Sequence, residues 1–367
     1  MPAPLTVHPQ EVTITAGDHS LSFDPTIGTL RSLLFGAEDR GLSPLHRAAW
    51  ADDPTLDGDP DLLPVERSLS GDFFCAPFGV SDVETAPAHG WTANSAWSVS
   101  HQADGEVCLS LDRTVLGARI RKRLRLTSDA PLLYQTHWID GGDGGLPVAH
   151  HPMVRLTGTG RLSTSPKQTA LTPAAPLEPG RHRLAYPAEQ ADLTRFPATA
   201  GGTVDLTRLP IADRHEDFVT LIEAPGASLG WTAVVRDAED DIVFFLKDPS
   251  VLPVTMLWHS NGGRDYRPWN GTHTGVIGIE DGCAAGADGH AAALTDNPIN
   301  RHGVPTALPL SHARRHRIDH VIGAIARPVG WSTVTDIVRS HDHLTLTDVG
   351  GGTVTLPFEP SFFIERT

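Results

Sequence analysis

The chain has 367 residues and a formal net charge of −15, with 35 glycines and 30 prolines spread along it. This negative charge argues against a nucleic-acid partner, which needs a basic surface, and against binding to an anionic membrane. No segment approaches the roughly 20 consecutive apolar residues of a membrane-spanning helix. Frequent glycine and proline favour short strands joined by turns over long helices, which proline breaks.

Cysteine usage and the N-terminal residues bear on the cellular compartment. Cys75, Cys108 and Cys283 lie far apart, and this odd, sparse set forms neither a disulfide framework nor a zinc pattern. Residues 1–17 contain no basic start followed by an apolar run, so we expect no signal peptide and a cytoplasmic location. Because no change in composition divides the chain, we predict a single domain over residues 1–367.

Alternation of apolar and polar residues predicts a mainly β protein, and many closely spaced strands suggest a sandwich or barrel. In residues 117–126, apolar side chains alternate with arginines at 119, 121, 123 and 125, which indicates a strand with one solvated face. Helical pattern is confined to 329–340 and part of 38–52, whereas 166–200 and 281–313 have the composition of loops. We expect the strands, in chain order, at 11–16, 106–111, 117–126, 132–139, 219–224, 229–235, 242–246, 254–259, 273–280, 317–326, 344–347 and 353–358.

A first candidate site segment follows residues 71–79, which read GDFFCAPFG. His89 precedes Gly90 and lies near Trp91 and Asn94. A histidine followed by glycine can hold its imidazole clear of the backbone beside an aromatic ring, on which the C–H face of a sugar stacks. The alternative is a histidine in a glycine-rich turn at the end of a strand.

A second segment contains adjacent histidines, His150 and His151, followed by Pro152. Neighbours on a strand point to opposite faces, so only one of the two can enter a given pocket. We favour His151, and His150 stays a candidate substrate contact because the strand register is open. A two-histidine metal site on one strand favours His-x-His spacing, so we expect no metal here.

The third segment, residues 256–283, predicts a strand, a turn and a second, apolar strand that ends near Glu280. A carboxylate at the end of an apolar strand is partly desolvated, which raises its pKa and makes it a better base near neutral pH. The alternative is a solvated glutamate at a strand end. The same segment supplies further candidate sugar contacts: Trp258, Asn261, Arg264, Asp265 and Trp269.

In this order, the three segments resemble the aldose 1-epimerase family and its galactose mutarotase-like relatives, over about residues 10–365. His89-Gly90 is similar to the first catalytic histidine of that family, His151-Pro152 to its second, and Glu280 to its general base. The resemblance implies an all-β, galactose mutarotase-like β-supersandwich, with large antiparallel sheets and few short helices.

The resemblance also implies an enzyme that interconverts the α and β anomers of a small carbohydrate by acid/base ring opening. Glu280 would be the base, His151 the acid at the ring oxygen, and His89 would polarise that oxygen or a neighbouring hydroxyl, without metal or organic cofactor. Many family members have an arginine near the first histidine, and residues 71–97 contain none. Two alternatives are a non-catalytic carbohydrate-binding protein on the same fold and a metal-dependent β-barrel enzyme that uses some of the 19 histidines. Neither the sugar nor the oligomeric state follows from the sequence.

Overall fold

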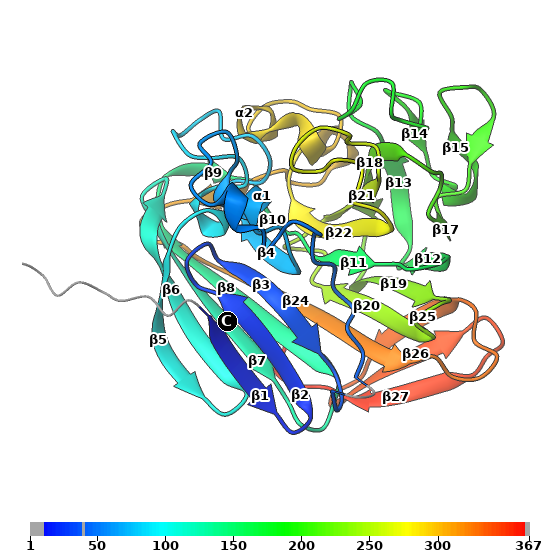
Figure 1. Ribbon diagram of the computed structural model, residues 1–367, viewed down its shortest axis with the longest axis horizontal. Helices are drawn as coiled ribbons and strands as arrows, with labels where there is room; N and C mark the ends of the chain where they lie inside the picture. Colours follow the sequence, from blue (N-terminus) through cyan, green and yellow to red (C-terminus); the bar gives the residue numbers. More distant parts are fainter. Residues whose placement is uncertain (1–10, 39–40, 364–367) are drawn as a thin grey trace, which may run out of the picture.

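The computed structural model describes residues 11–38 and 41–363. Two large antiparallel sheets dominate it and pack face to face (Figure 1). The first has eleven strands, in the order β1-β2-β3-β4-β10-β22-β21-β18-β13-β14 with β11 beside β22. The second has nine, in the order β17-β12-β19-β20-β24-β8-β7-β6-β5. The predicted all-β class is therefore confirmed.

The strands of the two large sheets come from both halves of the chain. The first sheet contains β1 (Val12–Ala16), β2 (His19–Asp24), β3 (Thr29–Leu34), β4 (Asp72–Cys75), β10 (Val148–His150), β11 (Met153–Arg155), β13 (Lys167–Leu171), β14 (Glu189–Gln190), β18 (His215–Glu223), β21 (Val254–Asn261) and β22 (Val276–Cys283). The second contains β5 (Trp97–Ala103), β6 (Glu106–Val115), β7 (Ala118–Leu126), β8 (Leu132–Gly141), β12 (Gly160–Thr164), β17 (Arg208–Leu209), β19 (Gly230–Arg236), β20 (Asp241–Lys247) and β24 (Arg315–Ala326).

Smaller elements complete the described chain. Three minor sheets contain β9 (Gly144–Leu146) with β23 (Leu308–Leu310), β15 (Phe196–Pro197) with β16 (Thr203–Val204), and β25 (Val334–Arg339), β26 (His343–Asp348) and β27 (Thr353–Pro357). The helices are single turns: α1 (Pro64–Arg67), α2 (His290–Ala293), and the 3-10 turns η1 (Pro54–Leu56), η2 (Trp91–Ala93), η3 (Leu193–Arg195), η4 (Gly286–Asp288) and η5 (Asn300–His302). Among the described residues, no helix is long and apolar enough to cross a membrane.

The main core lies between the two large sheets. It joins side chains such as Phe74 and Leu257 of the first sheet to Leu124 and Phe245 of the second. Strand β7 follows the predicted alternation, with Ile120 and its apolar neighbours in this core and its arginines on the opposite face. The outer faces of the two sheets are therefore available for other contacts.

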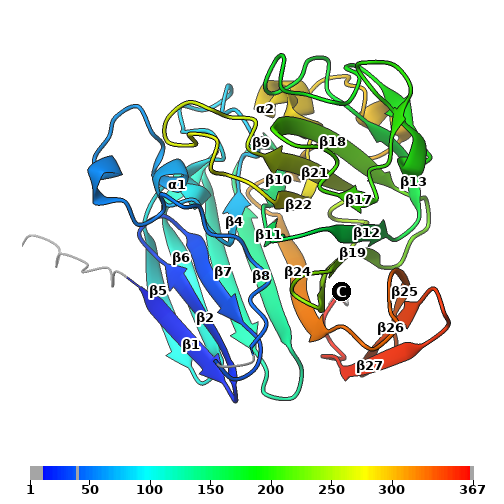
Figure 2. The same cartoon turned by 45° about the vertical axis from the view of Figure 1, so that its right-hand side comes forward.

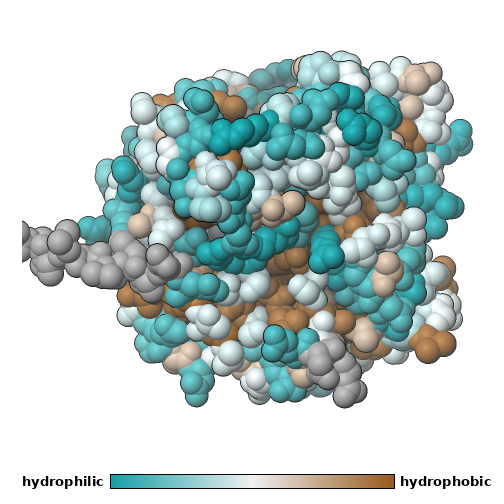
Figure 3. Space-filling view, in the orientation of Figure 1, coloured by the Kyte–Doolittle hydropathy of each residue, from teal (hydrophilic) through white to brown (hydrophobic). Residues whose placement is uncertain are grey.

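Each outer face has its own cover. Loops around 48–69 and 284–304 pack on the outer face of the first sheet in a second apolar cluster. The three-stranded β25–β27 sheet packs on one end of the second sheet, and Figure 2 shows it at the lower right, away from α1. In the view of Figure 3, hydrophilic residues cover most of the surface, and hydrophobic residues show mainly in the lower half.

Some secondary-structure predictions were wrong. Residues 334–339 of the predicted helix form β25, because Val334 and Ile337 are buried against the second sheet while the strand pairs with β26. The described part of 38–52 contains no helix and forms isolated bridges instead, including Leu45 with Val154. The predicted loop 166–200 includes the strand β13. The predicted strands are otherwise confirmed, although β22 starts at Val276 rather than at 273.

Two expectations stay predictions. The single domain over residues 1–367 is one of them. The absence of a signal peptide depends on residues 1–17, of which 1–10 lie outside the described residues.

Candidate active site

A hollow of about 210 Å³ opens on the outer face of the first sheet, under the loops that cover it. Six of the residues selected from the sequence line it: His89, His151, Trp258, Arg264, Trp269 and Glu280. These residues come from three segments that are far apart in the chain, so the sheet pairing brings them together.

The pairing of β22 with β10 and β11 places His151 opposite Glu280. Ala149 pairs with Gly282, and Met153 pairs with Gly278, so the turn residue His151 falls beside the middle of β22. The Nε2 atom of His151 lies 3.1 Å from Oε1 of Glu280. The imidazole is also stacked on the ring of Phe73, with ring centroids 4.4 Å apart and planes 23° apart.

Burial controls the protonation of this pair. Burial raises the pKa of Glu280 well above its usual value, and the positive charge of Arg264 offsets only part of that effect. Burial, together with neighbouring His89, lowers the pKa of His151 to about 3. Both shifts favour the uncharged form, so the pair holds one proton near neutral pH. Oε2 of Glu280 and Nδ1 of His151 are buried and make no hydrogen bond with the described residues.

His89 is held at the edge of the pair by a backbone that requires the following glycine. His89 has φ 64° and Gly90 has φ 73°. A Cβ atom on Gly90 would come 1.9 Å from the carbonyl oxygen of Ala76, so only glycine fits there. The imidazole of His89 lies edge-on to that of His151, 5.3 Å between centroids, and burial lowers its pKa to about 4. Its Nδ1 atom lies 3.4 Å from Sγ of Cys75.

Aromatic rings and one guanidinium form another part of the wall, and Trp258 lies edge-on to His151 with 5.7 Å between ring centroids. The guanidinium of Arg264 lies 4.4 Å from the ring centroid of Trp269 and 5.4 Å from that of Trp258. Its Nε atom is 3.2 Å from Oε1 of Glu178. The indole of Trp258 donates from Nε1 to Oε2 of Glu216 at 2.9 Å. The wall is thus fixed by hydrogen bonds and ring contacts before any ligand binds.

Two of the selected residues do not line the hollow because they support its loops. Asn94 donates its amide hydrogens to the carbonyl oxygens of Ala88 and Gly90, which holds the His89 turn in place. Asn261 donates to the carbonyl of Ala212 and accepts from the backbone N–H of Gly275. Their side chains are occupied with backbone groups away from the hollow, and their contact with a sugar stays a prediction.

Trp91, Asp265 and His150 also lie outside the hollow. Trp91 packs on the main core with the guanidinium of Arg113 at 4.1 Å from its ring centroid. Asp265 is exposed and forms an ion pair with Arg181. His150, the last residue of β10, points between the sheets, where its ring contacts His137 and His320.

An interior cluster of one carboxylate and two histidines has the composition of a metal site. One ligand atom each from Asp72, His150 and His320 lie within 4.8 Å of one another. However, the His150 and His320 rings are stacked, with centroids 4.2 Å apart and planes 14° apart. A ring nitrogen binds a metal in the plane of its ring, so two rings stacked in this way do not direct both lone pairs at one ion. The cluster instead forms part of the polar network between the sheets, and the expected absence of a metal stays a prediction.

Sequence reasoning missed several residues of the site. Phe73 and Phe78 line the hollow. They lie in residues 71–79, just before the segment that contains His89, and neither was selected as a site residue. Glu66 of α1 also lines it. Glu216, which binds Trp258 and Ser260, is fully buried at the start of β18. Its neighbours His215 and Asp217 are also polar, so no pattern in the sequence singled it out.

The paired large sheets and the hollow on their outer face define a β-supersandwich of the galactose mutarotase-like kind, which confirms the resemblance at the level of the fold. A structure of an Escherichia coli K12 protein, provisionally assigned as an aldose 1-epimerase, aligns with a TM-score of 0.58 and 15% identity, over 86% of this chain and 99% of that one.

Two further solved structures are similar. A galactose mutarotase related enzyme from Lactobacillus acidophilus aligns with a TM-score of 0.56 and 11% identity, over 87% of this chain and 98% of that one. A galactose mutarotase-like protein from Lactobacillus casei aligns with a TM-score of 0.52 and 14% identity, over 86% of this chain and all of that one. No protein-family model matches the sequence. No curated protein sequence matches it.

Proposed function

We propose that this protein is a mutarotase, which interconverts the α and β anomers of a free aldose. The observation that carries the proposal is the Glu280–His151 pair, 3.1 Å apart, in a hollow walled by aromatic rings. Binding a neutral sugar does not require two buried titratable groups to face each other. Proton transfer in both directions does require them.

The reaction needs one proton donor and one proton acceptor. The base takes the proton from the hydroxyl on C1, the bond between C1 and the ring oxygen breaks, and its electron pair goes to the ring oxygen, which takes a proton from the acid. Rotation about C1–C2 turns the aldehyde over, and the two steps then run in reverse. The pair therefore ends with the same single proton with which it began.

In the form that starts the reaction, Glu280 is the carboxylate base and His151 is the imidazolium acid. Before a sugar binds, the raised pKa of Glu280 and the lowered pKa of His151 place the shared proton on Glu280. Oε2 of Glu280 and Nδ1 of His151 have no hydrogen-bond partner among the described residues. A sugar hydroxyl that hydrogen-bonds to either atom satisfies a buried polar group. His89, at the edge of His151, is the candidate donor to the ring oxygen or a neighbouring hydroxyl.

The size and wall of the hollow favour a single sugar ring. Its volume of about 210 Å³ is below the roughly 300 Å³ at which pockets for drug-sized ligands begin. Trp258 and Trp269 offer apolar faces, while Arg264 and Glu66 are the charged side chains at hand for hydroxyl groups. The substrate class that follows is a monosaccharide aldose.

The experiment measures anomer exchange by NMR magnetisation transfer in a panel of aldoses and aldose phosphates, with and without the protein. The proposal expects exchange of at least one aldose well above its spontaneous rate. The rival is a non-catalytic carbohydrate-binding protein, and it is favoured by the absence of an arginine from residues 71–97, where many mutarotases have one. Sugar binding without faster exchange in any member of the panel would reject the mutarotase and support this rival.

A further inference from the structure

A basic surface lies on the outer face of the second sheet, on the opposite side of the sandwich from the candidate active site. The register of β24, β8 and β7 places Arg317, Trp138 and Arg121 side by side in one row. The next row along contains Arg315, Asp140 and Arg119. A tryptophan thus stands between arginines in the middle of an open sheet face.

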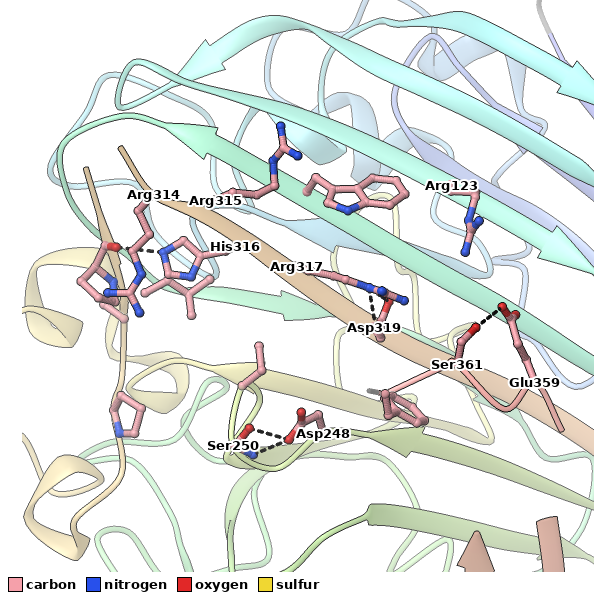
Figure 4. Close-up of a pocket in the computed structure, with 17 residues that line it drawn as sticks. Arg123, Asp248, Ser250, Arg314, Arg315, His316, Arg317, Asp319, Glu359 and Ser361 are labelled. Carbon is pink, nitrogen blue, oxygen red and sulfur yellow. Dashed lines mark hydrogen bonds and ion pairs between the residues drawn. The ribbon is translucent and has the colours of Figure 1, made fainter. Parts of the chain in front are cut away.

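This face is hollowed. A groove of about 1010 Å³ runs along β24, with the loop after β20 and the residues after β27 on its other side. Figure 4 shows Arg314, Arg315 and Arg317 along β24, with Asp248 and Ser250 across the groove. A second hollow of about 610 Å³ shares Arg315 and continues over β6 and β7.

The charge of these hollows is opposite to that of the chain. The chain has a formal net charge of −15. The lining arginines are Arg113, Arg119, Arg121, Arg123, Arg314, Arg315 and Arg317, and the lining carboxylates are Asp112, Asp140, Asp248, Asp319 and Glu359. Positive charge therefore exceeds negative charge here, against the trend of the molecule, and the surface attracts anions.

Several of these arginines, among them Arg119, Arg123 and Arg314, have no carboxylate oxygen at hydrogen-bond distance among the described residues. Three others are paired: Arg317 with Asp319 at 2.8 Å, Arg121 with Asp140 at 2.9 Å, and Arg315 with the same Asp140. The nearest carboxylate oxygen to Arg123, from Glu106, is 3.9 Å away. No hydrogen bond or ion pair joins the exposed side chains of Arg119 and Arg314 to another described residue. A free guanidinium is a fork that binds a carboxylate with two parallel hydrogen bonds.

Trp138 adds a second kind of contact. It is half-buried, and the guanidinium carbons of Arg121 and Arg123 lie 5.5 Å and 5.9 Å from its ring centroid. An indole face accepts the apolar face of a sugar ring, and the flanking forks match its carboxylates. We propose that this surface binds an acidic glycan, a chain of sugars that carry carboxylate groups.

Charge density favours this occupant over nucleic acid. Duplex DNA carries about one negative charge per 1.7 Å, and its binding depends on a strongly basic footprint. The surface has only a small excess of arginine over carboxylate, on a protein that is acidic overall. A glycan with one charge per sugar matches that excess. Because the surface and the hollow with Glu280 lie on opposite faces, this binding does not depend on the proposed catalysis.

The test is titration calorimetry of the full chain with tetragalacturonic acid, with neutral cellotetraose and a single-stranded DNA decamer as comparison probes. Wild type is expected to bind the acidic tetramer, more weakly as salt rises, and to bind neither comparison probe. The double variant Arg119→Glu/Arg314→Glu is expected to lose at least about tenfold in affinity, equivalent to about 1.4 kcal/mol. Trp138→Ala is expected to weaken binding as well.

Arg195→Glu is the matched control, since Arg195 is exposed on η3, away from the surface. It is expected to bind the tetramer within twofold of wild type. Anomer exchange is expected to be unchanged in all of these variants. The proposal is overturned by no binding of the tetramer, by equal binding in the double variant, or by equal or tighter binding of cellotetraose or the DNA decamer.

Discussion

Replacing Lys247 by methionine tests the polar network that joins the two sheets. Lys247 is 1% exposed, and its Nζ atom donates to the carbonyl of Val254 at 2.6 Å and to Oγ1 of Thr255 at 2.7 Å. It also lies 2.9 Å from Glu223 and 3.0 Å from Asp281. Lys247→Met keeps an unbranched side chain that is shorter by the ammonium group, and it leaves these carboxylates in the interior with one cation fewer.

Removing one partner from a buried ion pair costs about 3–5 kcal/mol, because the remaining charge is desolvated without compensation. That is a large part of the roughly 5–15 kcal/mol by which most domains are stable. With a urea m value of about 3 kcal/mol/M, the midpoint should fall by at least about 1 M. The assay is equilibrium urea unfolding followed by tryptophan fluorescence.

The double variant Lys247→Met/Asp281→Asn removes the unpaired charge as well. Its cost should be less than the sum of the two single costs, because the two groups interact directly at 3.0 Å. Arg195→Met, at an exposed position, is the control for loss of a surface cation and should change stability by less than about 0.5 kcal/mol. A fall of less than about 0.3 M for Lys247→Met, or additive single costs, would refute the reasoning.

Three further predictions concern the histidines and the aromatic wall. The pKa values of His46, His150 and His259 are lowered to about 4, 4 and 3. Stability should therefore fall from pH 7 to pH 5.5, by about 1.2 kcal/mol for each histidine, because only the unfolded chain takes up protons in this range. Equal urea midpoints at the two pH values would contradict this. Anomer exchange should not decline between pH 8 and pH 6, because the Glu280–His151 pair holds one shared proton near neutral pH. An inflection near pH 6.5 would indicate a solvated histidine instead. Trp269→Ala should raise KM by about tenfold with a smaller effect on kcat, because it removes part of the wall and the platform of Arg264; an unchanged KM would mean that the sugar does not touch this ring.

The elements that the sequence predicted well depend on short-range patterns. Alternation located most strands, and the rule that neighbours on a strand face opposite ways predicted that only one of His150 and His151 enters the pocket. The His89-Gly90 pair was selected because a following glycine lets the imidazole stand clear of the backbone, and the structure adds that the turn leaves no room for a Cβ on Gly90. Glu280 stood out because its strand is apolar, and the structure shows that this surrounding raises its pKa.

What the sequence did not predict depends on contacts between distant residues. Asn94 and Asn261 resembled sugar contacts, but a side-chain amide near a turn also satisfies backbone groups, and only the fold decides between these uses. Asp265 pairs with Arg181, which is 84 residues away in the chain. The helix expected over 329–340 is a strand because Val334 and Ile337 meet the apolar face of the second sheet.

The most direct test of the central claim is the rate of anomer exchange in Glu280→Gln, measured by NMR on the sugar that wild type accelerates most. The variant keeps the shape of the side chain and removes the proton acceptor, and Glu38→Gln, at an exposed position, is its control. General acid–base groups contribute about 10²–10⁴-fold to rates. The account predicts at least about a 100-fold loss with sugar binding retained, and an active control. Exchange within about threefold of wild type in Glu280→Gln would contradict it.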